Sequence, residues 1–328
     1  MKKKIALVTG GFSGEAVISY QSADNILQHL DRELFDVYKI DIQEKGWFYT
    51  DQQQSCQTVN RADFSITENG SRVHFDKALM CIHGTPGEDG KLPAYFELIG
   101  LPFTGCDASV SALTMNKRNT VAVVAAAGIR VAKSCLAFKD QEVDMEAILS
   151  LPFPVIVKPN DNGSSIGMSK IMEPDPEKLK AALDQAFRYS GQVLVEAFIK
   201  GREFTIGVMR DATQTIVTLP MTEVVLKQGR ELFDFEAKYN GETGEITPAE
   251  ASAEITAQVA CEAKKVYQTL GCKGIVRIDF IYHESEAYPY MLEVNTVPGQ
   301  TKESLIPKQV AAKGWTLKDF YTELILAK

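Results

Sequence analysis

The chain has 328 residues, of which 45% are hydrophobic and 24% charged, a composition ordinary for a globular protein of about two domains at ~150 residues each. Its 35 Lys and Arg against 43 Asp and Glu give a formal net charge of −8, which argues against a nucleic-acid partner. The longest apolar run, residues 121–129, is about half of the ~18 residues that cross a membrane. The start MKKKIALV contains too short an apolar stretch for a signal peptide, so we expect a cytoplasmic protein without a membrane partner.

The first third of the chain alternates between predicted strands and helices. Apolar runs bounded by glycine or proline predict strands, and a 3.6-residue apolar period predicts helices. The expected order is a strand ending in a glycine turn, a helix and three more strands, at residues 4–11, 17–30, 35–42, 77–82 and 102–104. This alternation is typical of a parallel sheet with functional loops at the carboxyl ends of its strands.

The rest of the chain mixes strands and helices without that alternation. Helices are expected over residues 116–127, 177–189 and 251–269, and strands over 134–137, 155–158, 193–198, 202–209, 215–222, 275–282 and 290–295. Residues 227–250 are polar and contain three glycines, which predicts a long functional loop. We therefore expect an open parallel α/β domain, residues 1–105, followed by two α+β sub-domains, residues 106–195 and 196–328.

Two glycine-rich loops follow strands of the first domain. The first, GGFSGE at residues 10–15, precedes a helix whose N-terminus can hold an anion or a carboxylate. A tight turn with a solvated Glu15 explains it equally well. The second, HGTPGEDG, contains His83, which is either a site residue or an incidental histidine of a polar loop.

A third glycine-rich loop joins two predicted strands. Lys158 ends the apolar run VIVK, and the small residues after it return into a second strand. Such a hairpin can lay backbone N–H groups and hydroxyls over phosphates, with the lysine supplying positive charge. The alternative is a hairpin that carries a surface lysine.

Carboxylates and an amide gather on the last two strands. Arg277 and Asp279 share one strand face, and Glu293 and Asn295 share the facing one. A hairpin turning at residues 284–287 brings Asp279 near Glu293. Oxygen ligands of this kind suit Mg²⁺ that bridges to substrate phosphates. The alternative is a simple pairing of Asp279 with Arg277 on a solvated face.

Ser304 follows the segment NTVPGQT and opens a predicted helix. The free N–H groups of that helix could receive a substrate carboxylate. Capping of the helix by the serine hydroxyl explains the residue just as well.

Taken together, these motifs resemble those of the D-alanine–D-alanine ligases, members of the ATP-grasp superfamily, over essentially the whole chain. Eight ordered blocks carry the resemblance: GGFSGE with S-x-x-SA, HGTPGEDG, GLPFTG with SALTMNK, VIVKPNDNGSSIGMSK, VEAFIKGREFTI, FDFEAKY with ITPA, RIDF, and LEVNTVPGQT with SLIP. The resemblance implies an enzyme that uses ATP to join two D-alanines through an acyl phosphate, for peptidoglycan precursor synthesis. It also implies a homodimer.

The resemblance also implies a role for each matching residue. The residues matching the ATP site are Lys117, Lys158, Ser164, Glu196, Ala197, Phe198, Ile199, Glu203 and Lys238. Those matching the site of two Mg²⁺ ions, for which Mn²⁺ could substitute, are Asp279, Glu293 and Asn295. Those matching the substrate site are Glu15, His83, Ser304 and Leu305. Those matching the catalytic set are Glu15, Ser164, Tyr239, Arg277 and Gly299.

Within this set, Arg277 and the Gly299 N–H would form an oxyanion hole, and Glu15, Ser164 and Tyr239 a hydrogen-bonded set closing the site. The loop 227–250 would act as a lid, with Lys238 reaching the γ-phosphate. By the resemblance, the tyrosine at position 239 favours D-alanine over D-lactate as second substrate.

Four residues depart from the family pattern, namely Ala16, Val17, Pro86 and Ala197, and they bear on nucleotide affinity and the first substrate site. The same motifs are compatible with two other functions. One is an ATP-grasp ligase for a different acid and amine. The other is a nucleotide-binding regulatory protein without turnover, which the complete set of metal-site carboxylates disfavours.

Overall fold

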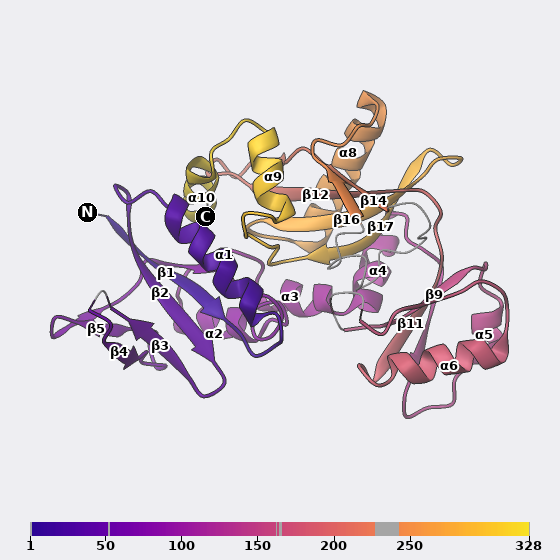
Figure 1. Cartoon of the computed structure of the whole chain (residues 1–328), viewed down its shortest axis with the longest axis horizontal. Helices are drawn as coiled ribbons and strands as arrows, with labels where there is room; N and C mark the ends of the chain where they lie inside the picture. Colours follow the sequence, from indigo (N-terminus) through magenta and orange to yellow (C-terminus); the bar gives the residue numbers. More distant parts are fainter. Residues whose placement is uncertain (1, 52, 162, 164–165, 227–242, 328) are drawn as a thin grey trace.

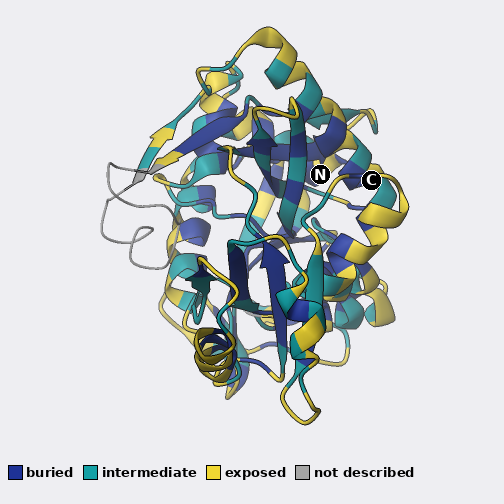
Figure 2. Ribbon diagram, turned by 90° about the vertical axis from the view of Figure 1, so that its right-hand side faces the viewer, coloured by how far each residue is buried: buried dark blue, intermediate teal, exposed yellow. Residues whose placement is uncertain are grey.

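The computed structural model describes residues 2–51, 53–161, 163, 166–226 and 243–327. The described residues form three larger sheets and one two-stranded pair, and helices pack against each of the larger sheets (Figure 1). Buried residues concentrate in the strands and on the inner faces of the helices (Figure 2). None of the helices in the described ranges has the length and apolar content to cross a membrane.

The first sheet is built around a parallel core. Its strand order is β4-β3-β2-β1-β7, and β1 runs parallel to both β2 and β7. The bounds are β1 Lys3–Gly10, β2 Phe35–Gln43, β3 Gly46–Thr50, β4 Cys56–Thr58 and β7 Lys77–Met80, with a separate pair β5 Ile66–Glu68 and β6 Ser71–Val73, and helices α1 Ala16–His29 and α2 Lys91–Ile99. Every residue of β1 from Ile5 on is buried, as expected for a central parallel strand.

Two features of this sheet differ from the expectation. The strands β3 and β4 add to it antiparallel, so the sheet is mixed rather than purely parallel. Residues 102–104 make a single bridge, Phe103 to Ala78, in place of a full strand.

The second sheet is antiparallel, in the order β10-β9-β11-β8. Its bounds are β8 Ser134–Phe138, β9 Val155–Pro159, β10 Ser169–Ile171 and β11 Gln192–Ala197, with helices α5 Met145–Leu149 and α6 Pro176–Ala186. The predicted hairpin around the third glycine-rich loop is confirmed, since Val157 pairs with Ser169.

The third sheet has the order β15-β14-β12-β16-β17, with β13 paired to β12. Its bounds are β12 Arg202–Arg210, β13 Ile216–Thr218, β14 Thr222–Leu226, β15 Thr243–Ile246, β16 Val276–His283 and β17 Tyr288–Asn295, with helices α8 Ala253–Leu270, α9 Leu305–Ala312 and α10 Leu317–Leu326. Phe204, Ile278 and Phe280 pack in one core with α8, and the alternate residues of the same strands face the opposite side of the sheet.

Two predictions for this region are wrong. Residues 215–222 form two strands rather than one, because Pro220 has no N–H to continue the ladder. Leu219, just before it, donates its N–H to Gly207 O (2.8 Å). Residues 243–246 belong to β15 and pair with β14, so they are not part of a loop as predicted, while residues 227–242 lie outside the described residues.

Several helices pack outside their own sequence region. The helices α3 Ala108–Met115 and α4 Lys117–Ala126 join the core of the third sheet, where Val121 and Val124 are buried. The last helix, α10, packs against α1, and Phe320 and Tyr321 share a core with Ile26 (Figure 1).

Candidate functional site

A cleft of about 880 Å³ lies where the three sheets meet. Each predicted site residue that the structure describes lines it: Glu15, His83, Lys117, Lys158, Glu196, Ala197, Phe198, Ile199, Glu203, Arg277, Asp279, Glu293, Asn295, Gly299, Ser304 and Leu305. The predictions for Ser164, Lys238 and Tyr239 fall outside the described residues.

The two glycine-rich loops of the first domain meet at the carboxyl ends of β1 and β7. Phe12 donates its N–H to Thr85 O at 2.9 Å. Gly84 has φ +66°, and a Cβ there would lie 2.7 Å from Ser13 Oγ and 2.9 Å from Glu15 Oε2. A glycine at 84 is therefore needed for the loops to approach each other.

Glu15 is half-buried between the His83 loop and the glycine-rich loop after β9. A Cβ built on Gly163, in the loop after β9, would lie 3.6 Å from Glu15 Oε1. Glu15 is therefore not a solvated turn residue: its carboxylate faces both the His83 loop and the glycine-rich loop of the second sheet.

His83 is buried, with 7% of its surface exposed. Its backbone N–H donates to Ser19 Oγ (3.0 Å), and its ring Nε2 lies 3.3 Å from Ser22 Oγ. Burial lowers the pKa of His83 below 6.5, although the Glu15 carboxylate acts in the opposite direction. His83 is therefore a neutral, buried histidine at the cleft wall rather than an incidental residue of a polar loop.

This burial predicts a pH dependence of stability. Since the folded pKa of His83 lies below the unfolded value of 6.5, the unfolded chain takes up this proton at a higher pH than the folded protein. The contribution to the free energy of unfolding is thus full above pH 6.5 and falls as the pH drops, by at most ~1.4 kcal/mol per pH unit. In urea unfolding between pH 7.5 and 5.5, His83→Gln should flatten this fall. His74→Gln, at an exposed histidine, is the control; parallel curves for His83→Gln and the parent would contradict the prediction.

Glu88 is a cleft residue to which the sequence assigned no role. It accepts hydrogen bonds from Gly84 N (2.7 Å) and Val297 N (3.4 Å), and burial raises its pKa. It therefore joins the His83 loop to the segment after β17. In the sequence, Glu88 stands out only as an acidic residue among glycines. Its bond to Val297 N could not be predicted, because Val297 lies 209 positions further along the chain.

Lys158 and Glu196 form a sequestered ion pair on neighbouring strands β9 and β11. The ammonium contacts the Glu196 carboxylate, and the two side chains are 14% and 10% exposed. Lys117 begins α4 beside them, with its N–H donated to Asn160 O (3.0 Å). Lys158 is thus not a surface lysine, and two lysines stand at the cleft where β9 ends.

Strands β16 and β17 place the carboxylates side by side. Asp279 is opposite Glu293, and Arg277 is opposite Asn295. Arg277 donates to Asp279 through Nε (3.0 Å) and Nη2 (2.8 Å), and Nη2 lies 4.0 Å from Glu293 Oε1. Burial alone would lower the pKa of Arg277, but the carboxylates of Asp279, Glu293 and Glu88 raise it. The guanidinium therefore stays charged.

The pairing of Arg277 with Asp279 does occur, but on a buried face rather than a solvated one, since Asp279 is 7% exposed. The carboxylates of Asp279 and Glu293 and the amide of Asn295 lie together here. The described residues contain no cluster of three or more His, Cys, Asp or Glu that could hold a metal. This donor set fits Mg²⁺, which binds through one or two carboxylates and takes its other ligands from water and phosphate.

Ser304 is the N-cap residue of α9, but its hydroxyl bonds elsewhere. Its Oγ accepts from Thr301 N (3.0 Å) and lies 2.8 Å from Thr301 Oγ1, and no side-chain bond to the helix N–H groups is formed. The predicted N-cap position of Ser304 is therefore confirmed, with its backbone carbonyl accepting from Lys308 N (3.5 Å), but capping by the serine hydroxyl does not occur. The start of α9 faces the cleft, since Ser304 and Leu305 both line it.

Three units that close around one cleft, with half-buried lysines on one wall and paired carboxylates on another, have the ATP-grasp fold. The family described as D-ala D-ala ligase N-terminus matches residues 4–106, and the one described as D-ala D-ala ligase C-terminus matches residues 117–326. The chain therefore belongs to the D-alanine–D-alanine ligase family.

Individual relatives agree with this assignment. A D-alanine–D-alanine ligase from Parabacteroides distasonis is 42% identical over 99% of this chain and 97% of its own length. The crystal structure of the VanG D-Ala:D-Ser ligase from Enterococcus faecalis is 31% identical, covers 99% of both chains and has a TM-score of 0.88. That of D-alanyl-alanine synthetase A from Vibrio cholerae is 26% identical over 99% of this chain and 97% of the other, with a TM-score of 0.86.

Proposed function

We propose that this chain joins two D-alanines to D-alanyl-D-alanine, a peptidoglycan precursor, with release of ADP and phosphate. The observation that carries the proposal is one cleft to which each of the three units contributes charged groups: Glu15 from the first, Lys158 from the second, and Arg277 with Asp279 from the third. These units are the proposed sub-domains, residues 1–105, 106–195 and 196–328.

ATP is proposed to lie between the second and third sheets. Lys117 and Lys158 would bind its phosphates, and Glu203 its ribose. The strand end and connection after β11 would face the adenine, namely Glu196, Ala197, Phe198 and Ile199. The side chains of Ile156, Met168 and Ile281 also line the cleft and offer apolar contacts to the base.

Asp279, Glu293 and Asn295 would hold two Mg²⁺ ions. Bound there, Mg²⁺ would neutralise charge on the oxygens of the transferring phosphoryl group. Thr205 Oγ1 donates to Asp279 and, together with Arg277, fixes the orientation of that carboxylate.

The first chemical step forms an acyl phosphate. Glu15 would bind the ammonium group of the first D-alanine beside His83. The carboxylate of this D-alanine then attacks the γ-phosphorus, with ADP as the leaving group. Arg277 stands next to the metal carboxylates and can neutralise charge on the incoming carboxylate.

The second step forms the peptide bond. The amine of the second D-alanine attacks the acyl carbon, phosphate leaves, and the negative oxygen of the tetrahedral intermediate would be stabilised by Arg277 and the Gly299 N–H. The carboxylate of this D-alanine would lie at the start of α9, near Ser304 and Leu305.

Part of the proposed machinery lies outside the described residues. By resemblance, Ser164 and Tyr239 would close the site together with Glu15, and Lys238 would reach the γ-phosphate. Exclusion of water by this set would protect the acyl phosphate from hydrolysis. Tyr239 is the residue proposed to favour D-alanine over D-lactate.

The deciding experiment measures phosphate release with ATP and Mg²⁺, and product mass, for D-alanine, L-alanine, and D-alanine mixed with D-serine or D-lactate. D-serine is included because the VanG relative is a D-Ala:D-Ser ligase. The expected result is a D-alanine dipeptide whose formation stops with EDTA and resumes with Mg²⁺ or Mn²⁺. Turnover with another acid but not with D-alanine would overturn the proposed substrate.

Gly299→Ala is expected to lower kcat/KM for D-alanine by about 10-fold or more. A Cβ at this position would lie 2.7 Å from Ser304 Oγ and 3.3 Å from its Cβ, so either the Ser304 hydroxyl must leave its bonds with Thr301 or the segment carrying the Gly299 N–H must shift. Gly191→Ala, at a glycine with open space around its Cβ position, is the matched control. Steady-state kinetics of both variants test this, and equal kcat/KM values would contradict it.

We also propose that the enzyme is a cytoplasmic homodimer, supported by the family precedent. Light scattering should then give a mass near twice 36.2 kDa.

A further inference from the structure

Gln300 follows Gly299 and is bonded through all of its polar groups. Its backbone N–H donates to Ser22 Oγ (3.1 Å), and its carbonyl accepts from Asn25 Nδ2 (2.8 Å). Its side-chain Oε1 accepts from the Tyr321 hydroxyl (3.2 Å), and Nε2 donates to Pro298 O (3.3 Å). Gln300 is 6% exposed, so these bonds are shielded from water and hold the backbone on both sides of Gly299.

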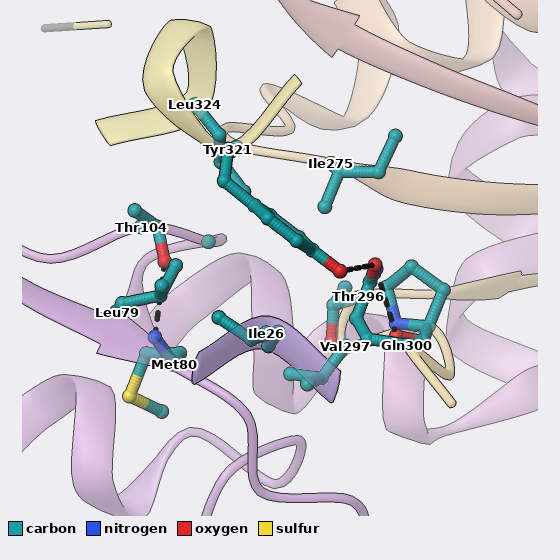
Figure 3. A pocket seen from close by; sticks show the side chains of 12 residues that line it. Ile26, Leu79, Met80, Thr104, Ile275, Thr296, Val297, Gln300, Tyr321 and Leu324 are labelled. Carbon is teal, nitrogen blue, oxygen red and sulfur yellow. Dashed lines mark hydrogen bonds between the residues drawn. The ribbon is translucent and has the colours of Figure 1, made fainter. Parts of the chain in front are cut away.

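The hydrogen bond from Tyr321 to Gln300 lies at a small cavity between residues of the first domain and the C-terminal helix α10. Figure 3 shows the tyrosine pointing from α10 toward Gln300, with the apolar side chains of Ile26, Leu79 and Leu324 nearby. Tyr321 is fully buried, and its hydroxyl bond to Gln300 lies among these apolar groups. A hydrogen bond in such surroundings is costly to break, because the separated groups find no water.

Ser22 extends these bonds to the other wall of the cleft. Its hydroxyl accepts from Gln300 N and lies 3.3 Å from His83 Nε2. The segment 298–300 and the His83 loop are therefore held by the same residue of α1.

We propose that Gln300 and Tyr321 are positioning residues, which fix the Gly299 N–H where it stabilises the tetrahedral intermediate of the second step. This inference rests on the proposed function. Neither side chain lies among those that touch the reacting groups in the mechanism above. Their effect is exerted through the backbone of residues 298–300.

The test counts phosphate released per dipeptide formed. If the loop is loosened, amine attack on the acyl carbon slows. In a larger share of turnovers the acyl phosphate is then lost by water attack at phosphorus, which returns D-alanine and phosphate without forming the tetrahedral intermediate. Tyr321→Phe and Gln300→Met should then release about two or more phosphates per dipeptide, against about one in the parent, with a lower kcat for dipeptide and an unchanged KM for ATP.

Tyr267→Phe is the matched control, because Tyr267 is also fully buried and donates its hydroxyl to a backbone carbonyl, Gly274 O (2.9 Å), in a different core. The Tyr267→Phe variant should release as many phosphates per dipeptide as the parent enzyme. A parent ratio retained in Tyr321→Phe, whatever its thermal stability, would overturn the inference, since mere loss of folded enzyme lowers both products equally. Absence of dipeptide from the parent enzyme would instead overturn the proposed function.

Discussion

Arg277→Lys is expected to lower kcat for dipeptide synthesis by about 10²–10³-fold, the usual cost of losing an oxyanion-hole donor. Lysine keeps the charge but cannot donate from two nitrogens to Asp279 as Arg277 does. Its single ammonium nitrogen cannot bind the Asp279 carboxylate and stabilise a developing oxyanion at the same time. The KM for ATP should change far less than kcat. Steady-state kinetics at saturating ATP and D-alanine measure both quantities.

The control for this variant is Arg130→Lys. Arg130 is also paired with a carboxylate, Glu286 (2.8 Å), but is 44% exposed and lies outside the cleft residues. It should keep the parent kcat. A kcat for Arg277→Lys within about threefold of the parent would exclude the guanidinium from the transition state.

Lys158→Met is expected to have two separate effects. It removes a proposed phosphate ligand, so the KM for ATP should rise by about 100-fold. It also leaves the Glu196 carboxylate buried without its cation, which should lower the free energy of unfolding by ~3 kcal/mol. Kinetics as a function of ATP, and urea unfolding in its absence, measure the two effects independently.

The double variant Lys158→Met with Glu196→Gln separates these causes. Neutralising Glu196 removes the unpaired charge, so a large part of the lost stability should return while the KM for ATP stays high. If the double variant is as unstable as the sum of the single variants, the ion pair is not the reason for the loss.

Much of the fold follows from local patterns. Short sequence patterns predict the local structure of β1, of β16 and β17, and of the glycine turns between elements. The hairpin expected from the alternation along β16 and β17 brings Asp279 opposite Glu293, as observed. The missed elements are of another kind. Strands such as β4 and β5 are three residues long and partly exposed, so a period of two has no room to show.

Site residues were missed where their partners are distant in sequence. Glu88 is held by N–H groups of Gly84 and Val297, and Gln300 by α1 and α10. Backbone donors carry no residue-type signature, so no motif marks these positions. Ser304 shows the converse, because it is the N-cap residue of α9 as its type suggests, yet its hydroxyl bonds Thr301 instead of the helix N–H groups.

The packing of α10 on α1 also affects the order in which the protein can mature during synthesis. The first strand and its glycine turn are made before the rest of the site, whereas Gln300 and its partner Tyr321 follow every proposed nucleotide ligand along the chain. A nascent chain that stops before Leu317 has every proposed nucleotide ligand but lacks the tyrosine that steadies the Gly299 segment. On this basis, the nucleotide site can assemble before α10 is made, and the ability to complete the peptide bond is acquired only once α10 has packed against α1.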